Sequence, residues 1–168
     1  FILPLFCITR QQKFMFKPNN NVFEERREIF LNKLNGKAAI VPSANLVKHH
    51  ADCEYPFRQD SNFWYLTGFD EPNSVALFLS HKPKGERFIL FVAPKDVIGE
   101  VWNGFRWGLK GAENVFKADK AHSIDDFKKL LSSYIEGAEE IVFSIGKHKE
   151  IETIVLEAFS RQLEGSSR

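Results

Sequence analysis

The stretch HHADCE carries the densest set of reactive side chains in the chain: His49, His50, Asp52, Cys53 and Glu54. Imidazole, thiolate and carboxylate groups are the ligands that zinc and related metals take in proteins. The spacing opposes a metal site, because adjacent histidine side chains diverge in a strand or a helix. No second cluster offers a closing pair of ligands, and the other histidines stand alone in the sequence. We therefore predict a polar loop here and no bound metal.

Other catalytic signatures are missing from the sequence. It contains no G-x-S-x-G nucleophile motif, no phosphate-binding loop and no G-x-G-x-x-G. Two acidic pairs, Glu24-Glu25 and Asp125-Asp126, fall on predicted helices, where solvated surface charge is the expected state. The residues alone therefore do not compose a complete active site.

The segment FRQDSNFWYLTGFDEP, residues 57–72, packs five aromatic residues among polar ones. Asp60 or Ser61 is a suitable N-cap, and Gly68 is a suitable helix stop. The pattern predicts a short helix that turns Phe63, Trp64 and Tyr65 in different directions, so that some face the core and some face outward.

A second unusual segment is EVWNGFRWGLKGA, residues 100–112, in which Trp102, Arg106 and Trp107 alternate with glycines. Glycine-rich backbone with projecting Trp and Arg is typical of a loop that docks a partner or ligand. The alternative is a loop whose Trp side chains cover the edge of a sheet. Composition alone leaves both interpretations open.

The elements around these segments indicate an α/β layered domain with a mixed sheet. Helical periodicity marks residues 22–35, 123–137 and 149–163, and Ser123 with Asp126 forms a capping box for the second of these. Apolar runs predict buried strands at 37–44 and 140–146, and a hairpin from 74–80 and 87–94 joined by HKPKGE.

Composition bounds the protein class. The chain has 168 residues, 43% hydrophobic and 27% charged, with a net charge of +1, which fits one globular domain and favours neither nucleic acid nor a membrane as partner. The apolar start FILPLFCI is too short to span a bilayer. We expect residues 1–14 to be a disordered or non-native extension and residues 15–168 to be the domain.

The two cysteines bear on location. Cys7 and Cys53 lie in different contexts, which favours a reducing, cytoplasmic location without a disulfide.

The two unusual segments together resemble the N-terminal domain of Xaa-Pro aminopeptidase, also called aminopeptidase P. The first segment matches at Asp52, Tyr55, Pro56, Arg58, Gln59, Ser61, Phe63, Tyr65, Leu66, Thr67, Gly68, Phe69, Glu71 and Pro72. The second matches at Glu100, Trp102, Gly104, Arg106, Gly108, Gly111 and Ala112. The resemblance covers residues 22–146 and departs from the family pattern at His49 and His50, which further opposes a metal there.

The resemblance implies a three-layer α/β domain with a mixed β-sheet flanked by helices, as in creatinase and prolidase. Family members remove an N-terminal residue that precedes proline, using two metal ions, usually manganese, in a C-terminal pita-bread domain. That domain does not fit in the residues after Gly146, so this chain resembles a non-catalytic assembly and substrate-access domain. The implied partners are its own catalytic domain, neighbouring subunits of a homo-oligomer and proline-containing peptides.

Within this family, Trp102 resembles a residue that reaches the mouth of a neighbouring subunit's active site, and the other motif residues resemble structural positions. A free-standing module that binds peptides or proteins remains the alternative. A creatinase-like amidinohydrolase is disfavoured by FRQDSNFWYLTGF, which resembles the aminopeptidase branch.

Overall fold

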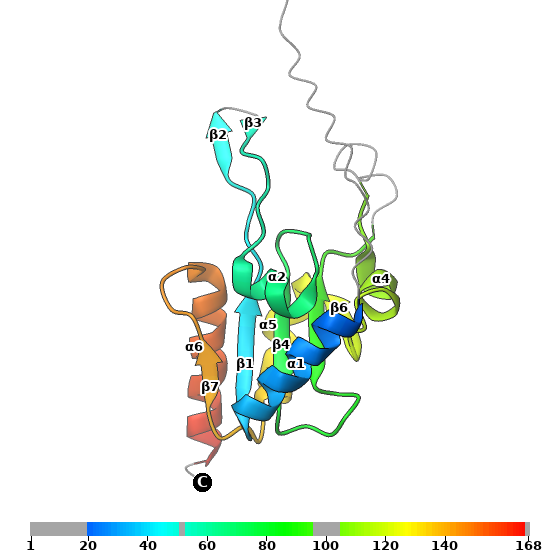
Figure 1. The fold of residues 1–168 in the computed structure, drawn as a ribbon. Helices are drawn as coiled ribbons and strands as arrows, with labels where there is room; N and C mark the ends of the chain where they lie inside the picture. Colours follow the sequence, from blue (N-terminus) through cyan, green and yellow to red (C-terminus); the bar gives the residue numbers. More distant parts are fainter. Residues whose placement is uncertain (1–19, 51–52, 96–104, 167–168) are drawn as a thin grey trace, which may run out of the picture.

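The computed structural model describes residues 20–50, 53–95 and 105–166, and these build an open sheet with helices on both faces (Figure 1). The strand order is β6-β5-β4-β1-β7. The strands are β1 (Ala38–Pro42), β4 (Val75–Leu79), β5 (Phe88–Val92), β6 (Lys120–Ser123) and β7 (Ile141–Phe143). β4 pairs antiparallel with β1 and β5, whereas β6 and β7 add parallel strands at the two edges. The predicted α/β class with a mixed sheet is confirmed.

Two layers of helices bury the two sides of this sheet. α1 (Asn20–Leu34), α2 (Ser61–Thr67) and α4 (Gly108–Asn114) pack on the side that carries Ala39, Phe78 and Leu90. α5 (Phe127–Ile135) and α6 (Lys149–Ser166) pack on the opposite side. Every residue of β4 and β5 is buried, because successive side chains enter opposite helix layers.

The main elements predicted from the sequence are present with small shifts at their ends. The hairpin forms with Val75 opposite Phe91, and the short helix of the aromatic segment is α2. The strand predicted at 140–146 is wrong in its burial and length: β7 is a three-residue edge strand in which Val142 remains 45% exposed. The cause is its place at the edge of the sheet, with a neighbouring strand on one side only.

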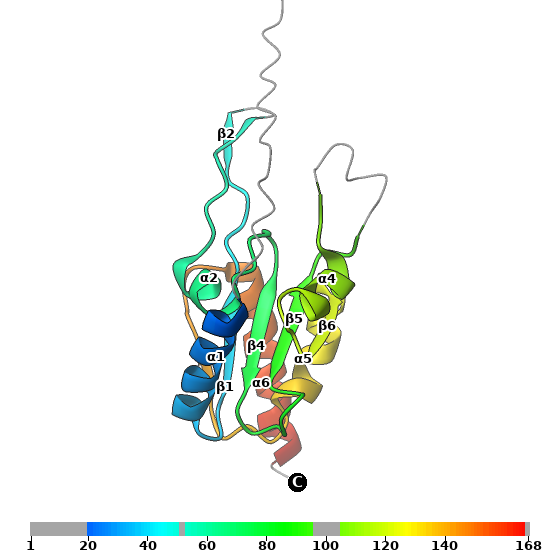
Figure 2. The same cartoon turned by 45° about the vertical axis from the view of Figure 1, so that its right-hand side comes forward.

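Three features differ from the expected loops and caps. Ser123 caps a 3₁₀ turn, η1 (Ile124–Asp126), by accepting from Asp125 N at 3.3 Å, so the capping box with Asp126 is wrong. The helix α4 occupies part of the segment expected to be a glycine-rich loop. The polar loop expected at HHADCE is instead the antiparallel pair β2 (Lys48–His50) and β3 (Cys53–Glu54), which projects away from the sheet (Figure 2).

None of the helices in the described ranges 20–50, 53–95 and 105–166 combines the length and apolarity needed to cross a bilayer. The extension expected at residues 1–14 lies outside those ranges.

Candidate functional site

The helix α2 is held at both ends by residues that the sequence marks. Asp60 accepts hydrogen bonds from Asn62 N at 2.9 Å and Phe63 N at 3.1 Å, which satisfies donors of the first turn. Gly68 ends the helix in the left-handed conformation, with φ of 66°, and donates to Trp64 O. Phe63 is fully buried and Tyr65 is 54% exposed, so the helix turns its aromatic residues to different sides as predicted.

Two arginines of α1 complete the far end of α2. Arg26 donates to Tyr65 O at 3.3 Å and its guanidinium lies 4.2 Å from the Tyr65 ring centre. Arg27 donates to Leu66 O at 3.2 Å and is only 5% exposed. Burial lowers the Arg27 pKa to about 10. The last carbonyls of a helix lack partners within it, so these two cations fix α2 to α1.

Gln59 joins three separate parts of the chain through one side chain. Its Oε1 accepts from Ala44 N at 2.8 Å and from Asp60 N at 2.9 Å. Its Nε2 donates to Phe69 O at 3.1 Å and to Glu71 O at 3.0 Å. The end of β1, the start of α2 and the chain after α2 therefore meet at this amide.

Glu71 connects the two motifs that lie far apart in the sequence. Its side chain is fully buried, and its Oε1 accepts from Trp107 N at 2.8 Å. Trp107 packs edge-on against Phe116 with ring centres 5.3 Å apart, and Phe116 packs against Phe69 at 4.8 Å. The aromatic segment and the Trp-containing segment thus form one packed unit over the α1 side of the sheet.

Comparison with known proteins identifies this arrangement. A family model described as the aminopeptidase P N-terminal domain matches residues 23–143. The chain belongs to the aminopeptidase P N-terminal domain family. The joined motifs described above are therefore the local structure of an aminopeptidase P N-terminal domain.

Longer relatives and solved structures support the same family assignment. The Xaa-Pro aminopeptidase of Haemophilus influenzae is 36% identical over 146 residues, covering 86% of this chain and 34% of the relative. The enzyme of the same name in Escherichia coli is 30% identical over 145 residues, covering 86% of this chain and 33% of the relative. A solved variant of Escherichia coli aminopeptidase P matches with a TM-score of 0.82 and 29% identity, over 90% of this chain and 35% of that one. The chain thus spans about a third of the length of these two curated relatives.

The predicted site residues divide into three groups in this aminopeptidase P N-terminal domain. Trp102, Glu100 and Gly104 lie outside the described residues. Buried positions are Phe63, Gly68, Glu71 and Pro72, whereas Gln59 and Arg106 are half-buried. Arg58, Ser61 and Tyr65 are exposed. The structure brings Gln59 and Glu71 together and leaves Arg58 and Ser61 on the surface.

The described residues do not fit the metal centre of the family. Among the side chains that the structure describes, no three from His, Cys, Asp or Glu come together. Of the HHADCE segment, the structure describes only the His49 side chain, which packs edge-on against Tyr55 with ring centres 4.5 Å apart; the side chains of His50, Asp52, Cys53 and Glu54 lie outside the description. The described part of this domain therefore offers manganese no ligand set.

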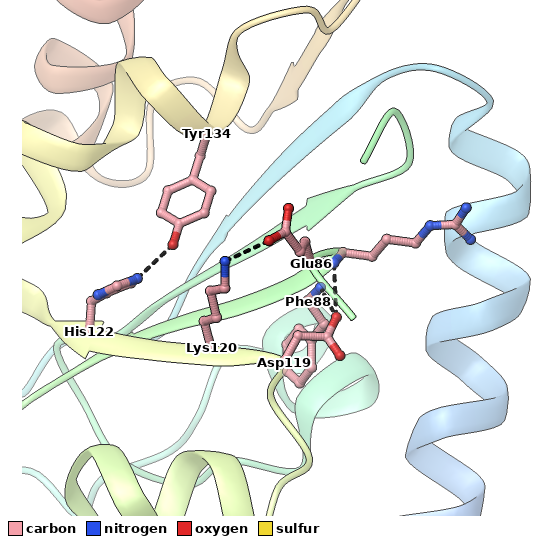
Figure 3. A network of polar contacts seen from close by, with 7 residues as sticks. Glu86, Phe88, Asp119, Lys120, His122 and Tyr134 are labelled. Carbon is pink, nitrogen blue, oxygen red and sulfur yellow. Dashed lines mark hydrogen bonds and ion pairs between the residues drawn. The ribbon is translucent and has the colours of Figure 1, made fainter. Parts of the chain in front are cut away.

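A polar network at the β6 edge was not found by sequence reasoning (Figure 3). His122 Nε2 and the Tyr134 hydroxyl lie 2.6 Å apart, and Lys120 pairs with Glu86 at 2.7 Å. Burial raises the pKa of Tyr134. Asp119 accepts from Arg87 N and Phe88 N at 2.8 and 2.9 Å, which secures the start of β5. The only signal in the sequence is a short polar run, so periodicity does not reveal the network.

A groove of about 450 Å³ runs between α1, α2 and β7, with β1 at its base. Cationic side chains from α1 and from the loop after β7 line it: Arg26, Lys33 and Lys147. The carboxylate of Asp60 also lines it, 3.7 Å from Lys147 Nζ. Burial lowers the pKa of His148 at the same end, an effect that Asp60 opposes and Lys147 reinforces.

Proposed function

We propose that this chain is the non-catalytic assembly and substrate-access domain of a metal-dependent Xaa-Pro aminopeptidase. The parent enzyme removes an N-terminal residue that precedes proline, and its catalytic domain would hold two manganese ions that would supply Lewis-acid activation of water. The observation that carries the proposal is the joining of both family motifs through Glu71 and Trp107 in an aminopeptidase P N-terminal fold.

The chemistry of the described residues supports this partition between the domains. Their carboxylates act as helix caps, ion pairs and backbone acceptors, as Asp60, Glu86 and Asp119 illustrate. Hydrolysis of a peptide bond by this family needs a ligand set that this part of the chain does not bring together. The proposal assigns the catalytic groups to a separate domain, and the length of a matched relative, of which this chain covers 34%, leaves room for one.

The proposal includes the partners of the domain. Its own catalytic domain and neighbouring subunits of a homo-oligomer are the macromolecular partners, and proline-containing peptides are the substrates. Trp102 supplies an apolar face at the mouth of a neighbouring subunit's active site, where a proline ring stacks well. The proposed location is the reducing cytoplasm, because Cys7 and Cys53 lie in dissimilar segments and are not expected to form a disulfide.

One experiment separates this function from a free-standing binding module. The purified 168-residue chain is incubated with manganese and a Xaa-Pro peptide, beside a longer protein in which the same chain precedes a catalytic domain. We expect the longer protein alone to release the N-terminal amino acid. Turnover that stays with the short chain through repurification contradicts the proposal, as does a longer protein that binds peptides without cleaving them.

The role of Trp102 has its own test. As a projecting contact, Trp102→Ala changes the unfolding free energy of the isolated chain by no more than about 0.5 kcal/mol. The same substitution in the longer enzyme weakens substrate use. A core position instead costs about 3–5 kcal/mol in the isolated chain, which urea unfolding distinguishes readily.

A further inference from the structure

An exposed apolar surface lies on the α1 side of the edge strand β7. Val142 pairs with Ala39, which belongs to the core on that side, so Val142 points into the groove between α1, α2 and β7. Val142 remains exposed there, and Ile29 of α1, which also lines the groove, is 51% exposed. A continuous apolar patch with polar residues at its rim is typical of a contact between proteins.

A second exposed apolar surface lies on the other side of β7, along α6. Leu156 is 55% exposed and Phe159 is 40% exposed, and residues three or four apart lie on one side of a helix. Glu152, one turn earlier, continues the same line, and we call these three residues the α6 stripe. Lys128 of α5 pairs with Glu157 at 2.9 Å, which turns a different side of α6 toward α5. The stripe therefore faces away from α5, toward the side of the molecule where β7 ends the sheet (Figure 1).

The groove and the α6 stripe carry opposite charges. Three cations line the groove: Arg26, Lys33 and Lys147. The carboxylate in its lining, Asp60, caps α2 and lies 3.7 Å from Lys147 Nζ, so it offsets this positive charge only in part. The α6 stripe, in contrast, begins with the carboxylate of Glu152. An apolar stripe that begins with a carboxylate complements an apolar groove bordered by cations.

One rotation brings each surface onto its counterpart in a second copy of the chain. The groove and the α6 stripe lie on opposite faces of the sheet, both beside β7. A two-fold axis parallel to β7, just outside the sheet, turns the second copy over, so that its α6 stripe faces the groove of the first copy and the reverse. Such a contact is isologous and closes at two copies. It also covers the edge of β7, which in the described sheet has a neighbouring strand on one side only.

We propose that two copies of this chain associate across β7, with the α6 stripe of each copy docked on the groove of the other. Rotation about this axis preserves the position along the strand, and Glu152 accepts from Gly146 N, in the loop after β7, at 3.0 Å. Glu152 therefore meets Lys147 of the second copy, while Leu156 and Phe159 cover the apolar floor of its groove. The inference deepens the proposed function, on which it rests only for the expectation of neighbouring subunits, by assigning the surface through which two of them meet.

Sedimentation velocity of the 168-residue chain tests the contact directly. We expect a monomer–dimer equilibrium within about 1–100 µM and no larger species. Leu156→Lys in the stripe and Ile29→Lys in the groove each raise the dimer dissociation constant about tenfold or more, because each sets a cation in the centre of the contact. Val22→Lys, at an exposed apolar position of α1 that does not line the groove, is the matched control and leaves the constant within about twofold. All three positions are exposed in the single chain, so the far-UV circular dichroism stays unchanged.

Mixed and compensating variants test whether the two surfaces meet each other. Homodimers of Leu156→Lys or of Ile29→Lys lose both contacts, whereas a mixed dimer of the two variants keeps one native contact. We expect the mixture to dimerise more tightly than either variant alone. Lys147→Glu and Glu152→Lys each weaken the dimer severalfold, and the double variant regains most of the loss, because the opposite charges again face each other.

A chain that stays monomeric over this concentration range overturns the proposal. A dimer that neither Leu156→Lys nor Ile29→Lys weakens also overturns it, and leaves the groove to another occupant such as the catalytic domain of the parent enzyme. Assembly that continues beyond two copies contradicts the two-fold axis. Peptide release by the longer protein is measured separately, so failure of this contact and failure of the proposed function are distinguishable.

Discussion

At the scale of single residues, Gln59 shows why an amide rather than a charge stands in the family motif. The site needs two acceptors for Ala44 N and Asp60 N and two donors for the carbonyls of Phe69 and Glu71. Only an Asn or Gln amide supplies both kinds of group on one planar end. Its neighbour Arg58 is exposed, so of these two adjacent motif residues Gln59 is the one whose side chain the fold requires.

We predict that Gln59→Leu lowers the unfolding free energy by about 2–4 kcal/mol, because several part-buried backbone groups lose their partners. Gln59→Glu keeps the acceptors but sets a carboxylate against two carbonyls, so it destabilises by a similar amount. Urea unfolding measures both, and Arg58→Leu is the surface control, expected within about 0.5 kcal/mol. A Gln59→Leu chain as stable as the control contradicts the role assigned to Gln59.

Protonation of His81 makes the stability of the folded chain depend on pH. Its Nε2 lies 3.1 Å from Tyr134 O, and burial lowers its pKa below the ordinary value of 6.5, with Lys82 acting in the same direction. The unfolded chain therefore binds the proton more readily than the folded chain. The stability that neutral His81 contributes is complete above about pH 6.5 and is lost as the pH falls through the lowered folded pKa.

We predict that urea midpoints fall between pH 7.5 and 5.5 and that His81→Gln, which keeps a donor without titrating, flattens this fall. Burial lowers the pKa of His148 as well, so the double variant with His148→Gln is flatter still. Parallel profiles for the parent chain and His81→Gln would exclude His81 as a source.

At the scale of elements, α2 depends on Gly68 for two reasons. The residue adopts φ of 66°, and an added Cβ would lie 2.8 Å from the Phe23 ring of α1. The left-handed conformation costs a residue with a side chain about 1–2 kcal/mol, and the close contact with a buried ring adds to that. Gly85 also has a positive φ, of 88°, but open space around it.

We predict that Gly68→Ala destabilises the chain by about 2–4 kcal/mol, whereas Gly85→Ala costs only about 1 kcal/mol. The difference between the two variants isolates the contact between α1 and α2. Thermal and urea unfolding measure it, and equal costs would show that the Phe23 ring moves aside freely.

The same elements show how far sequence reasoning reaches. α2 was predictable because Asp60 and Gly68 encode both of its ends locally. α4 was not, since its glycines favour a loop by propensity; Gly111 is required because an added Cβ would lie 2.7 Å from Trp107 Cβ. β6 was missed because Lys120 and His122 give it no apolar alternation, and its pairing with β5 is decided by tertiary structure.

The candidate site also has a part that the sequence predicts and a part that it does not. The family motif marked Gln59 and Glu71, but the hydrogen bond from Trp107 to Glu71 spans 36 positions and follows only from the packing of two loops. Separation of this kind leaves no periodic signal in the sequence.

At the scale of the whole molecule, the sheet needs both helix layers. The family model ends at residue 143, before α6. In the structure, α6 buries Val155 and Ala158 against the cluster that contains Ile40, Leu77 and Leu131. The helix is therefore part of the core of this domain.

We predict that a chain ending at Gly146 loses cooperative unfolding, because the apolar side of β1 and β7 that faces α6 becomes exposed. Near-UV circular dichroism should weaken and binding of a hydrophobic dye should rise, while far-UV signal from the other helices persists. A chain ending at Ser166 keeps α6 and is the control, expected to unfold in one transition like the parent chain. If the chain ending at Gly146 unfolds in one transition with native near-UV dichroism, then α5 alone covers this face and α6 is dispensable to the domain.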